Sequence, residues 1–521
     1  MNDIEKLSSL NSNVKLYSHQ QRVVDNNKTS QIIAHGVGSG KTLTGIAKFE
    51  KMKDRGQAHK ALVITPAGLR SNFGNDGVGK FTNSTYNIVG NKAEISKGIA
   101  KPLNPNSDYN IISYEGFKKN PAKILQETGA DTVIFDEAHR MRNDVAQTTQ
   151  AIRNVRPLYK NQISLTGSIV NNKPEDLYSL VDITTGGKHK LGATANQFDN
   201  TFLKRKTGYT GSNINKAPIA GFNHKFKLRR ELGKVIDYAG YEELKKSADM
   251  PGKKIQNIYV PLDKTQTKLY KGFLKGNRDV ANIMKMKRWD SLSPSAVKKT
   301  YNSSMQARRM MNNVGSVLPG APNTSPKTEK LLNDVQTHLN SDKRNQVALF
   351  SQLINGGMDT VESGLKKRNI PYGVFYGKGN KGSSEFERQN NIQNYNSGKN
   401  KVILISGAGG EGLSLKNTTM EGMLDPHYNP ERMNQMEARG VRSGGLKDRK
   451  DRNVKINQYV SVMPKTLGIF PSKYKTPDQF IYGVANRKNT QNEMLRKLLR
   501  KNTRMQTIRQ KFTNLFAKKS P

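Results

Sequence analysis

Short apolar runs separated by helical stretches mark the first third of the chain. In order, the runs are SQIIAH, KALVITPA, YNIISYE, DTVIFDEAH and QISLTGS. Each run is rich in β-branched residues or Leu and is bounded by turn-forming residues, which predicts parallel strands with helices between them. The same pattern returns later in QVALFSQL, PYGVFYG, KVILISGAG, EGMLDPHYNP and VKINQYVSV. We therefore predict an α/β protein with two separate parallel-sheet blocks.

The stretch between the two blocks, from about residue 173 to 325, follows another pattern. GYTGSNINKAPIAG is typical of an exposed loop, and VLPGAPNTSPK, rich in Pro, Gly, Ser and Asn, predicts the linker between the blocks. QTKLYKGFLKGNRDVANIMKMKRW and SMQARRMMNNV predict basic helices. The predicted domains are 1–232 for the first block, 233–325 for a helical insertion and linker, 326–485 for the second block, and 486–521 for a tail.

The tail is strongly basic and carries a single acid, Glu493. Its apolar residues recur at spacings typical of one helix face: Met494, Leu498, Met505, Ile508, Phe512 and Leu515. This predicts an amphipathic basic helix. Either its apolar face packs on the second block and leaves the basic face in solvent, or the helix contacts DNA or a partner.

Charge is the strongest signal in the composition. The 521 residues include 86 Lys and Arg against 42 Asp and Glu, a net charge of +44. A chain this basic is expected to bind a polyanion, and nucleic acid is the usual one. The absence of Cys excludes disulfides and thiolate zinc sites and favours a reducing compartment. No long apolar run predicts a membrane span, and MNDIEKLSSL lacks the apolar core of a signal peptide.

A glycine-rich turn follows the first apolar run, in HGVGSGKT. A strand, such a turn and a helix beginning at Lys41 direct backbone N–H groups at an anion. Lys41 would reach the β- and γ-phosphates of a nucleotide, and the Thr42 hydroxyl would coordinate Mg²⁺. His35 stands where the common pattern has its first Gly. The predicted phosphate-binding residues are Gly38, Ser39, Gly40, Lys41 and Thr42.

Two further groups of charged residues suit nucleotide hydrolysis. An apolar strand delivers Asp136 and Glu137 side by side at its C-terminal end, where ligands bind in an open parallel sheet. Asp136 suits Mg²⁺, and Glu137 suits activation of the attacking water. In NQMEARGVR, Gln435, Arg439 and Arg442 stand at i, i+4 and i+7, which predicts one helix face able to clamp a γ-phosphate.

The order of these motifs resembles superfamily-two helicase-type ATPases, most closely the Swi/Snf-type DNA translocases and the poxvirus- and phage-type nucleoside triphosphate phosphohydrolases. LYSHQQ, GSGKT, ALVITPAGLRSNF, IISYEGF, DEAHR and LTGSIVNNKPEDLYSLV resemble the motifs of the first lobe. KIQNIYVPLDKTQTKLY resembles a Swi/Snf-type segment, and VALFSQL, ILISGAGGEGLSLKN, DPHYNP and NQMEARGVR resemble the motifs of the second. The resemblance covers roughly residues 15 to 460.

The sequence departs from the family pattern in three motifs. The first departure is His35. The second is Ser168 with Ile169, where relatives commonly have Thr and Pro, which puts the coupling of hydrolysis to movement in question. The third is Ala438, which replaces a Gly before Arg439.

The resemblance implies two tandem RecA-like lobes, a helical insertion between them, and ATP with Mg²⁺ as cofactors. Gln20 would recognise the adenine, and Gly412 would lie at the nucleotide. The residues that it places on nucleic acid are Thr65, Pro66, Ser113, Tyr114, Ser351, Gln352, Gly407 and Glu411. Backbone amides would make many of these contacts, chiefly to phosphates.

The activity implied is ATP-dependent translocation on duplex DNA by a virus- or phage-encoded protein. Such a protein would lie in the host cytoplasm or nucleus, or be packaged in a virion. Two alternatives stay open: a strand-separating DNA or RNA helicase, and a basic virion or genome-associated protein with minor ATPase activity. The sequence does not specify the oligomeric state, or which transcription, replication or virion proteins are partners.

Overall fold

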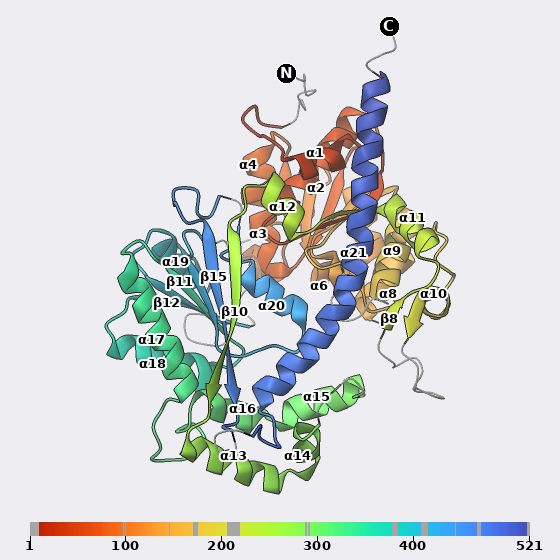
Figure 1. Cartoon of the computed structure of the whole chain (residues 1–521). Helices are drawn as coiled ribbons and strands as arrows, with labels where there is room; N and C mark the ends of the chain where they lie inside the picture. Colours follow the sequence, from red (N-terminus) through yellow and green to blue (C-terminus); the bar gives the residue numbers. More distant parts are fainter. Residues whose placement is uncertain are drawn as a thin grey trace. The chain divides into compact units, whose positions relative to one another are not determined.

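The computed structural model describes residues 10–96, 98, 100–144, 146–169, 176–205, 219–286, 289, 292–377, 384–407, 415–442, 444–465 and 470–517. The chain divides into two compact units (Figure 1). The first unit comprises Met1–Gly208, Ile219–Asp249 and Gln491–Pro521, and the second comprises Tyr209–Pro218 and Met250–Thr490.

The first unit is built on a seven-stranded parallel sheet in the order β3-β4-β2-β5-β6-β1-β9. Its strands are β1 (Ser30–His35), β2 (Ala61–Thr65), β3 (Tyr86–Ile88), β4 (Tyr109–Ser113), β5 (Thr132–Phe135), β6 (Asn161–Leu165) and β9 (Ile236–Ala239). β7 (Leu203–Arg205) and β8 (Ile219–Phe222) form a separate antiparallel pair. The five strands predicted in this block are confirmed as β1, β2, β4, β5 and β6.

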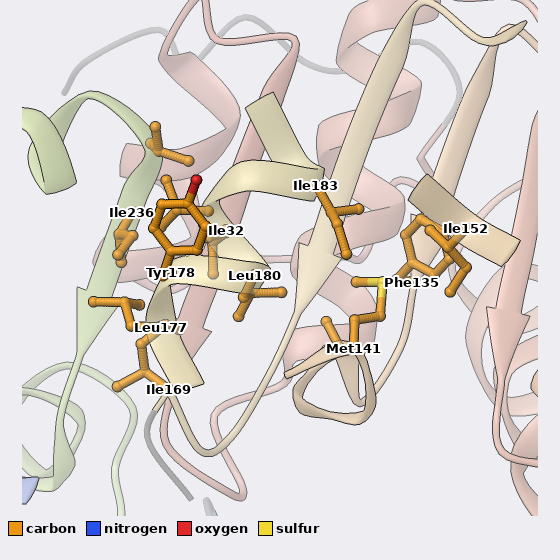
Figure 2. Close-up of a cluster of buried hydrophobic side chains, with 14 of the residues drawn as sticks. Ile32, Phe135, Met141, Ile152, Ile169, Leu177, Tyr178, Leu180, Ile183 and Ile236 are labelled. Atoms are coloured by element: carbon orange, nitrogen blue, oxygen red, sulfur yellow. The ribbon is translucent and has the colours of Figure 1, made fainter. Parts of the chain in front are cut away.

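Helices cover both faces of the first sheet. They are α1 (Ser18–Asp25), α2 (Lys41–Asp54), α3 (Arg70–Phe73), α4 (Gly79–Phe81), α5 (Lys92–Ser96), α6 (Tyr114–Phe117), α7 (Pro121–Thr128), α8 (Gln147–Val155), α9 (Asp176–Thr185), α10 (Ala195–Phe202), α11 (Lys225–Val235) and α12 (Tyr241–Ser247). Along β1, Ile32 packs in one hydrophobic cluster with Leu177 and Leu180 of α9 (Figure 2), while Ile33 packs in another with Phe49 of α2. The alternation of strand side chains therefore buries both faces.

The second unit has a six-stranded parallel sheet in the order β10-β15-β14-β11-β13-β12. Its strands are β10 (Gly252–Pro261), β11 (Val347–Ser351), β12 (Tyr372–Phe375), β13 (Val402–Ser406), β14 (Met420–Met423) and β15 (Asn453–Val462). Its helices are α13 (Lys264–Gly276), α14 (Arg278–Met284), α15 (Pro294–Ser303), α16 (Met305–Asn312), α17 (Pro326–Ser341), α18 (Asp359–Lys367), α19 (Glu385–Asn396) and α20 (Pro430–Glu437). The five strands predicted here are confirmed as β11 to β15, and the two basic helical segments predicted in the insertion are confirmed as α13 with α14, and as α16.

The unit boundaries differ from the predicted domain boundaries. The first unit runs past residue 232 to Asp249, because β9 pairs with β1. β10, inside the predicted insertion, is the edge strand of the second sheet and pairs with β15 along its whole length. The segment GYTGSNINKAPIAG lies outside the described residues except for its last three, which belong to β8.

The tail is part of one long helix, α21 (Pro477–Ala517). From Gln491 onward this helix belongs to the first unit, and Leu495, Leu498 and Leu499 lie in the first unit's hydrophobic cluster. The alternative that packed the tail on the second block is therefore wrong. The spacing of apolar residues defines an apolar helix face, but it does not determine which hydrophobic core packs against that face.

Candidate active site

The phosphate-binding loop joins β1 to α2 in the first unit. Gly38 and Gly40 have φ angles of 80° and 74°, in the left-handed region that glycine adopts without strain. A Cβ atom on Gly40 would lie 2.7 Å from Nε2 of Gln20, so the loop also needs glycine there for space. Lys41 begins α2, and its Nζ donates a hydrogen bond to the Gly36 carbonyl at 3.3 Å. The local sequence therefore builds the predicted anion cradle, with Ser39 and Thr42 in place beside it.

Gln20 lies directly against this loop. Its Nε2 donates to the carbonyls of Ser39 and Gly40, each at 3.3 Å, and its Oε1 accepts from the Tyr17 amide at 2.8 Å. The side chain is buried. The structure thus assigns Gln20 a role in holding the loop, and adenine recognition by Gln20 stays a prediction.

His35 is buried and anchors the start of the phosphate-binding loop to β9. Its Nε2 lies 2.8 Å from Oδ1 of Asp237 on β9, the strand beside β1. Arg22 of α1 binds both oxygens of the same carboxylate, at 2.8 and 2.9 Å. Burial lowers the pKa of His35, so its ring is neutral at pH 7. Arg22 and His35 together hold the pKa of Asp237 below its usual range.

His19 completes this network behind the loop. Its Nε2 lies 3.0 Å from the Ser39 carbonyl, and its Nδ1 lies 3.1 Å from Oγ of Ser247 in α12. Burial lowers its pKa to about 4, so the neutral ring donates from Nε2 to the carbonyl and accepts at Nδ1. Sequence reasoning missed His19, Arg22 and Asp237. No local signal links Asp237 to a loop some two hundred residues earlier.

Replacing His35 with the glycine that the common pattern has there should destabilise the folded protein. His35→Gly removes a buried hydrogen bond to a carboxylate and leaves a cavity, so we expect the free energy of unfolding to fall by about 3 kcal/mol. Urea denaturation measures this loss. His59→Gly is the matched control, because its side chain is 78% exposed and also pairs with a carboxylate, that of Asp131. Equal losses in the two variants would contradict an anchoring role.

The acid pair follows β5. Oδ1 of Asp136 accepts from the Glu137 amide, and Oδ2 accepts from the Thr65 hydroxyl, both at 3.0 Å. Burial, with the nearby charge of Glu137, raises the pKa of Asp136 to about 6. Glu137 has a φ of 51°, and its Oε2 lies 3.1 Å from Nδ1 of His139. The left-handed backbone turns the second carboxylate away from the strand direction.

The chemistry of these donors fits Mg²⁺. The Thr42 hydroxyl and the Asp136 carboxylate offer oxygens, and Mg²⁺ in such sites takes one or two carboxylates together with substrate phosphates. Burial is the main reason that the pKa of Asp136 is raised, so a bound cation would stabilise its ionised form. Within the described ranges, no cluster of three or more His, Asp or Glu residues forms an all-protein metal cage.

Two predicted nucleic-acid contacts instead hold the acid pair. Thr65 and Tyr114 are 0% and 2% exposed, and the Tyr114 hydroxyl donates to the Asp136 carbonyl at 2.8 Å. The reason is the strand order: β4, β2 and β5 are neighbours, so the residues at their ends meet Asp136. Both residues are buried as a whole, and their contact with nucleic acid stays a prediction. The Ser113 hydroxyl caps α6, and Pro66 is buried, so side-chain contacts are not favoured at these positions either.

The Thr65 contact predicts a pH effect. An ionised Asp136 is the form that holds the metal, so kcat/KM for MgATP should fall as the pH drops through about 6. The Thr65 hydroxyl lowers the pKa of Asp136. Thr65→Val should therefore raise this pKa and move the acid limb of the pH–rate profile to higher pH. Thr128→Val, a buried threonine of α7 bonded within its own helix, is the control. Superimposable profiles for Thr65→Val and wild type would contradict this account.

The departure at Ser168 and Ile169 is explained by packing. Ile169 is 6% exposed and belongs to the hydrophobic cluster that contains Leu177 and Tyr178 (Figure 2). The turn before it is closed by Thr166, whose hydroxyl donates to the Ser168 carbonyl at 3.0 Å. A buried Ile thus replaces the fixed φ of Pro as the constraint on this segment.

In the second unit, polar residues at the ends of β11, β14 and α16 form a buried network. The Ser351 hydroxyl donates to the Asp425 carboxylate and to the Leu353 carbonyl, the latter at 2.9 Å. Asp425 also accepts from Nδ2 of Asn312 at 2.6 Å. Ser351 is 1% exposed and its side chain is held in this network, and its contact with nucleic acid stays a prediction.

Gln352 and Gly407 are adjacent in the same unit. A Cβ atom on Gly407 would lie 2.2 Å from Oε1 of Gln352, so glycine is required for this approach. Gln352 is partly exposed, and of the two predicted contacts at β11 it is the one with an available side chain. Glu411 and Gly412 lie outside the described residues, and their predicted roles stay predictions.

The predicted arginine face is not one continuous helix. α20 ends at Glu437, so Gln435 lies on the helix while Arg439 and Arg442 lie in the turn after it. Ala438 has a φ of −86°, which needs no glycine. Gly440 follows, and its amide donates to the buried Glu421 carboxyl at 2.7 Å, where a side chain would not fit.

Arg439 and Arg442 lie in surroundings that favour binding of an anion. Burial and the like charge of Arg439 lower the pKa of Arg442 to about 9. Among the described residues, buried Nε of Arg442 has no hydrogen-bond partner. A phosphate would supply the missing acceptor and relieve the repulsion.

Comparison with known proteins decides the family. A model of the SNF2-related domain matches residues 11–316, more than half of the chain, and a model of the helicase conserved C-terminal domain matches residues 327–444. The chain belongs to the SNF2-related family. It is an ATP-dependent, helicase-like motor whose ATP hydrolysis depends on nucleic acid, and the two predicted RecA-like lobes are confirmed.

Curated relatives of this SNF2-related motor vary in length. "Putative ATP-dependent RNA helicase L538" of Acanthamoeba polyphaga mimivirus is 26% identical, over 91% of this chain and 94% of that protein. The ISWI chromatin-remodeling complex ATPase ISW1 of Saccharomyces cerevisiae is 25% identical over 81% of this chain, but this chain spans only 36% of its length. RAD54-like DNA repair and recombination protein of Gallus gallus is 25% identical, over 80% of this chain and 59% of that protein.

Solved structures resemble the chain at low sequence identity. The Sulfolobus solfataricus SWI2/SNF2 ATPase core in complex with dsDNA is 20% identical, over 93% of this chain and 97% of that chain, with a TM-score of 0.38. The helicase domain of Pyrococcus furiosus Hef is 13% identical, over 85% and 94%, with a TM-score of 0.48. In the described part of this SNF2-related chain, no helix is long and apolar enough to cross a membrane.

Proposed function

We propose that this chain is a translocase that moves along duplex DNA, driven by ATP with Mg²⁺. The observation that carries the proposal is the division of the hydrolytic residues. The phosphate loop and the acid pair belong to the first unit, and Arg439 and Arg442 belong to the second. Hydrolysis then requires the units to meet, which would tie each chemical cycle to a movement between them.

The track is inferred from charge and from relatives. A net charge of +44 favours phosphate contacts, which fix position on a strand without reading its sequence. The yeast relative is named as part of a chromatin-remodeling complex and the chicken relative as a DNA repair and recombination protein. Both names support DNA as the track here.

A strand-separating helicase is the second candidate. The mimivirus relative matches over nearly its whole length, and its name assigns it to RNA. The same likeness supports a viral or phage origin, and hence action inside a host cell or packaging in a virion. The basic-structural-protein alternative is less favoured, because Lys41, Asp136, Glu137, Arg439 and Arg442 are all present.

Two displacement assays in one buffer separate the candidates. A translocase should displace a third strand from a DNA triplex when ATP is added, and leave a partial duplex paired. A helicase should separate the strands of a DNA or RNA duplex. Strand separation without triplex displacement would overturn the proposal, and ATPγS in place of ATP controls for displacement by binding alone.

A further inference from the structure

A concave apolar surface on the first unit is lined by residues of β8, α11 and the part of α21 that follows Gln491. It encloses about 690 Å³ and includes none of the nucleotide-site residues. Its floor is formed by Phe222, Phe226, Met494 and Leu498. Phe226 is 68% exposed, which is unusual for a large aromatic side chain. We call this surface the α11–α21 groove.

The rim of the α11–α21 groove is uniformly basic. It carries Lys225 and Arg229 on α11 and Lys497 and Lys501 on α21. Residues 219–230 and 494–501, which line the groove, contain no Asp or Glu. Among the described residues, Lys225, Lys497 and Lys501 make no ion pair, and the nearest acid along the tail, Glu493, pairs with Arg496 and Arg500. Four positive charges therefore surround the apolar floor, and a fifth lining residue, Arg500, is paired with Glu493.

We propose that the α11–α21 groove docks an acidic amphipathic helix of a partner protein. An amphipathic helix lays apolar side chains at i, i+3, i+4 and i+7 into such a groove. The carboxylates that flank this face would meet the basic rim, which favours rapid and oriented association. The partly buried Met494 can adapt to different apolar side chains. The groove would bring the motor to its place of action, independently of the proposed translocase activity.

Other occupants fit less well. Single-stranded nucleic acid is held by successive exposed aromatic rings, whereas Phe222 is 7% exposed and leaves Phe226 as the one exposed ring of the lining. A second copy of the chain would bring another net charge of +44 and be repelled. The end of this chain cannot supply the carboxylates, because residues 494–521 contain no acid.

Binding of two synthetic peptides to the full chain tests the proposal. One is a fluorescein-labelled helix of roughly 18 residues, or about five turns, with Leu on one face and Glu elsewhere. The other has the same composition in a scrambled order without an apolar face. We expect the amphipathic peptide to bind about tenfold more tightly than the scrambled one, by fluorescence anisotropy. Equal affinities would show attraction by charge alone and would overturn the proposal.

Substitutions in the groove locate the binding. Phe226→Ala should weaken binding of the amphipathic peptide about tenfold, since it removes the exposed aromatic side chain that would anchor the peptide. Phe386→Ala, at a phenylalanine that is 81% exposed in the second unit, is the matched control and should change nothing. Lys497→Glu should weaken binding of the peptide more than Lys119→Glu does. Lys119→Glu is the control, because it reverses the charge of another exposed lysine of the first unit.

The same variants distinguish a nucleic-acid site. Neither Phe226→Ala nor Lys497→Glu should change the rate of ATP hydrolysis without nucleic acid, which also reports correct folding. A labelled deoxythymidine oligonucleotide should bind wild type and Phe226→Ala equally. The groove is not a peptide-docking site if Phe226→Ala weakens binding of the oligonucleotide as much as binding of the peptide. The same conclusion follows if Phe226→Ala leaves binding of the peptide unchanged.

Discussion

Glu137→Gln should reduce ATP hydrolysis about 10³-fold while ATP still binds. The amide has the shape of the carboxylate but cannot accept a proton from the attacking water. Glu137 is held at the end of β5 by a left-handed backbone, and its neighbour Asp136 is fixed by Thr65 and Tyr114. Steady-state hydrolysis with duplex DNA measures the loss, and binding of a fluorescent ATP analogue measures retained affinity.

Glu115→Gln is the matched control for this prediction. Glu115 lies on α6, is 63% exposed at its side chain and pairs with Arg140 at 3.6 Å. Its substitution should leave hydrolysis unchanged, since surface ion pairs contribute little. If Glu137→Gln keeps a tenth of the wild-type rate, the group that activates water is another residue.

Arg442→Ala should lower kcat about 10³-fold, with little loss of stability. The reason for both effects is the same. Burial and Arg439 destabilise the charge of Arg442 in the folded chain, and lower its pKa to about 9, until an anion arrives. Removing the charge relieves that repulsion but takes away a cation that would stabilise the transferring phosphoryl group. The rate of hydrolysis and the melting temperature are measured on the same sample.

Arg344→Ala controls for loss of an arginine in the second unit. Its side chain is 71% exposed and pairs with Asp342, so neither the rate nor the melting temperature should change. A fall in the melting temperature of Arg442→Ala in proportion to the lost activity would show a structural role. In that case the arginine would not act on the phosphate.

Local sequence was sufficient to predict the elements that carry the chemistry. A strand, a glycine pair and a helix start fix the phosphate loop, and an apolar strand followed by two acids fixes the acid pair. All the residues that define each motif lie within a short stretch of the sequence. Their geometry therefore follows from backbone preferences that a short stretch already contains.

The contacts between distant segments could not be predicted in this way. His35 was interpreted as a departure from the loop pattern, because only the pairing of β9 with β1 brings its distant partner Asp237 to the loop. Thr65 and Tyr114 were assigned to nucleic acid, because only the strand order reveals that they end beside Asp136. For Arg439 and Arg442, a helical period was extended past the true end of α20.

The tail shows the same limit. Its apolar spacing predicted a helix correctly, and the structure confirms α21. Which unit buries Leu495 and Leu499 depends on a surface that forms only after the first unit has folded. A helix face is encoded locally, whereas its partner is encoded by the whole chain.

The rate of ATP hydrolysis with no nucleic acid, duplex DNA, single-stranded DNA and RNA tests the central claim most directly. For a motor that tracks duplex DNA, we predict that duplex DNA gives the largest stimulation, and that salt weakens it steeply because phosphate contacts release counterions. Equal rates under all four conditions would contradict the account. They would show an ATPase whose chemistry is not tied to a nucleic-acid track.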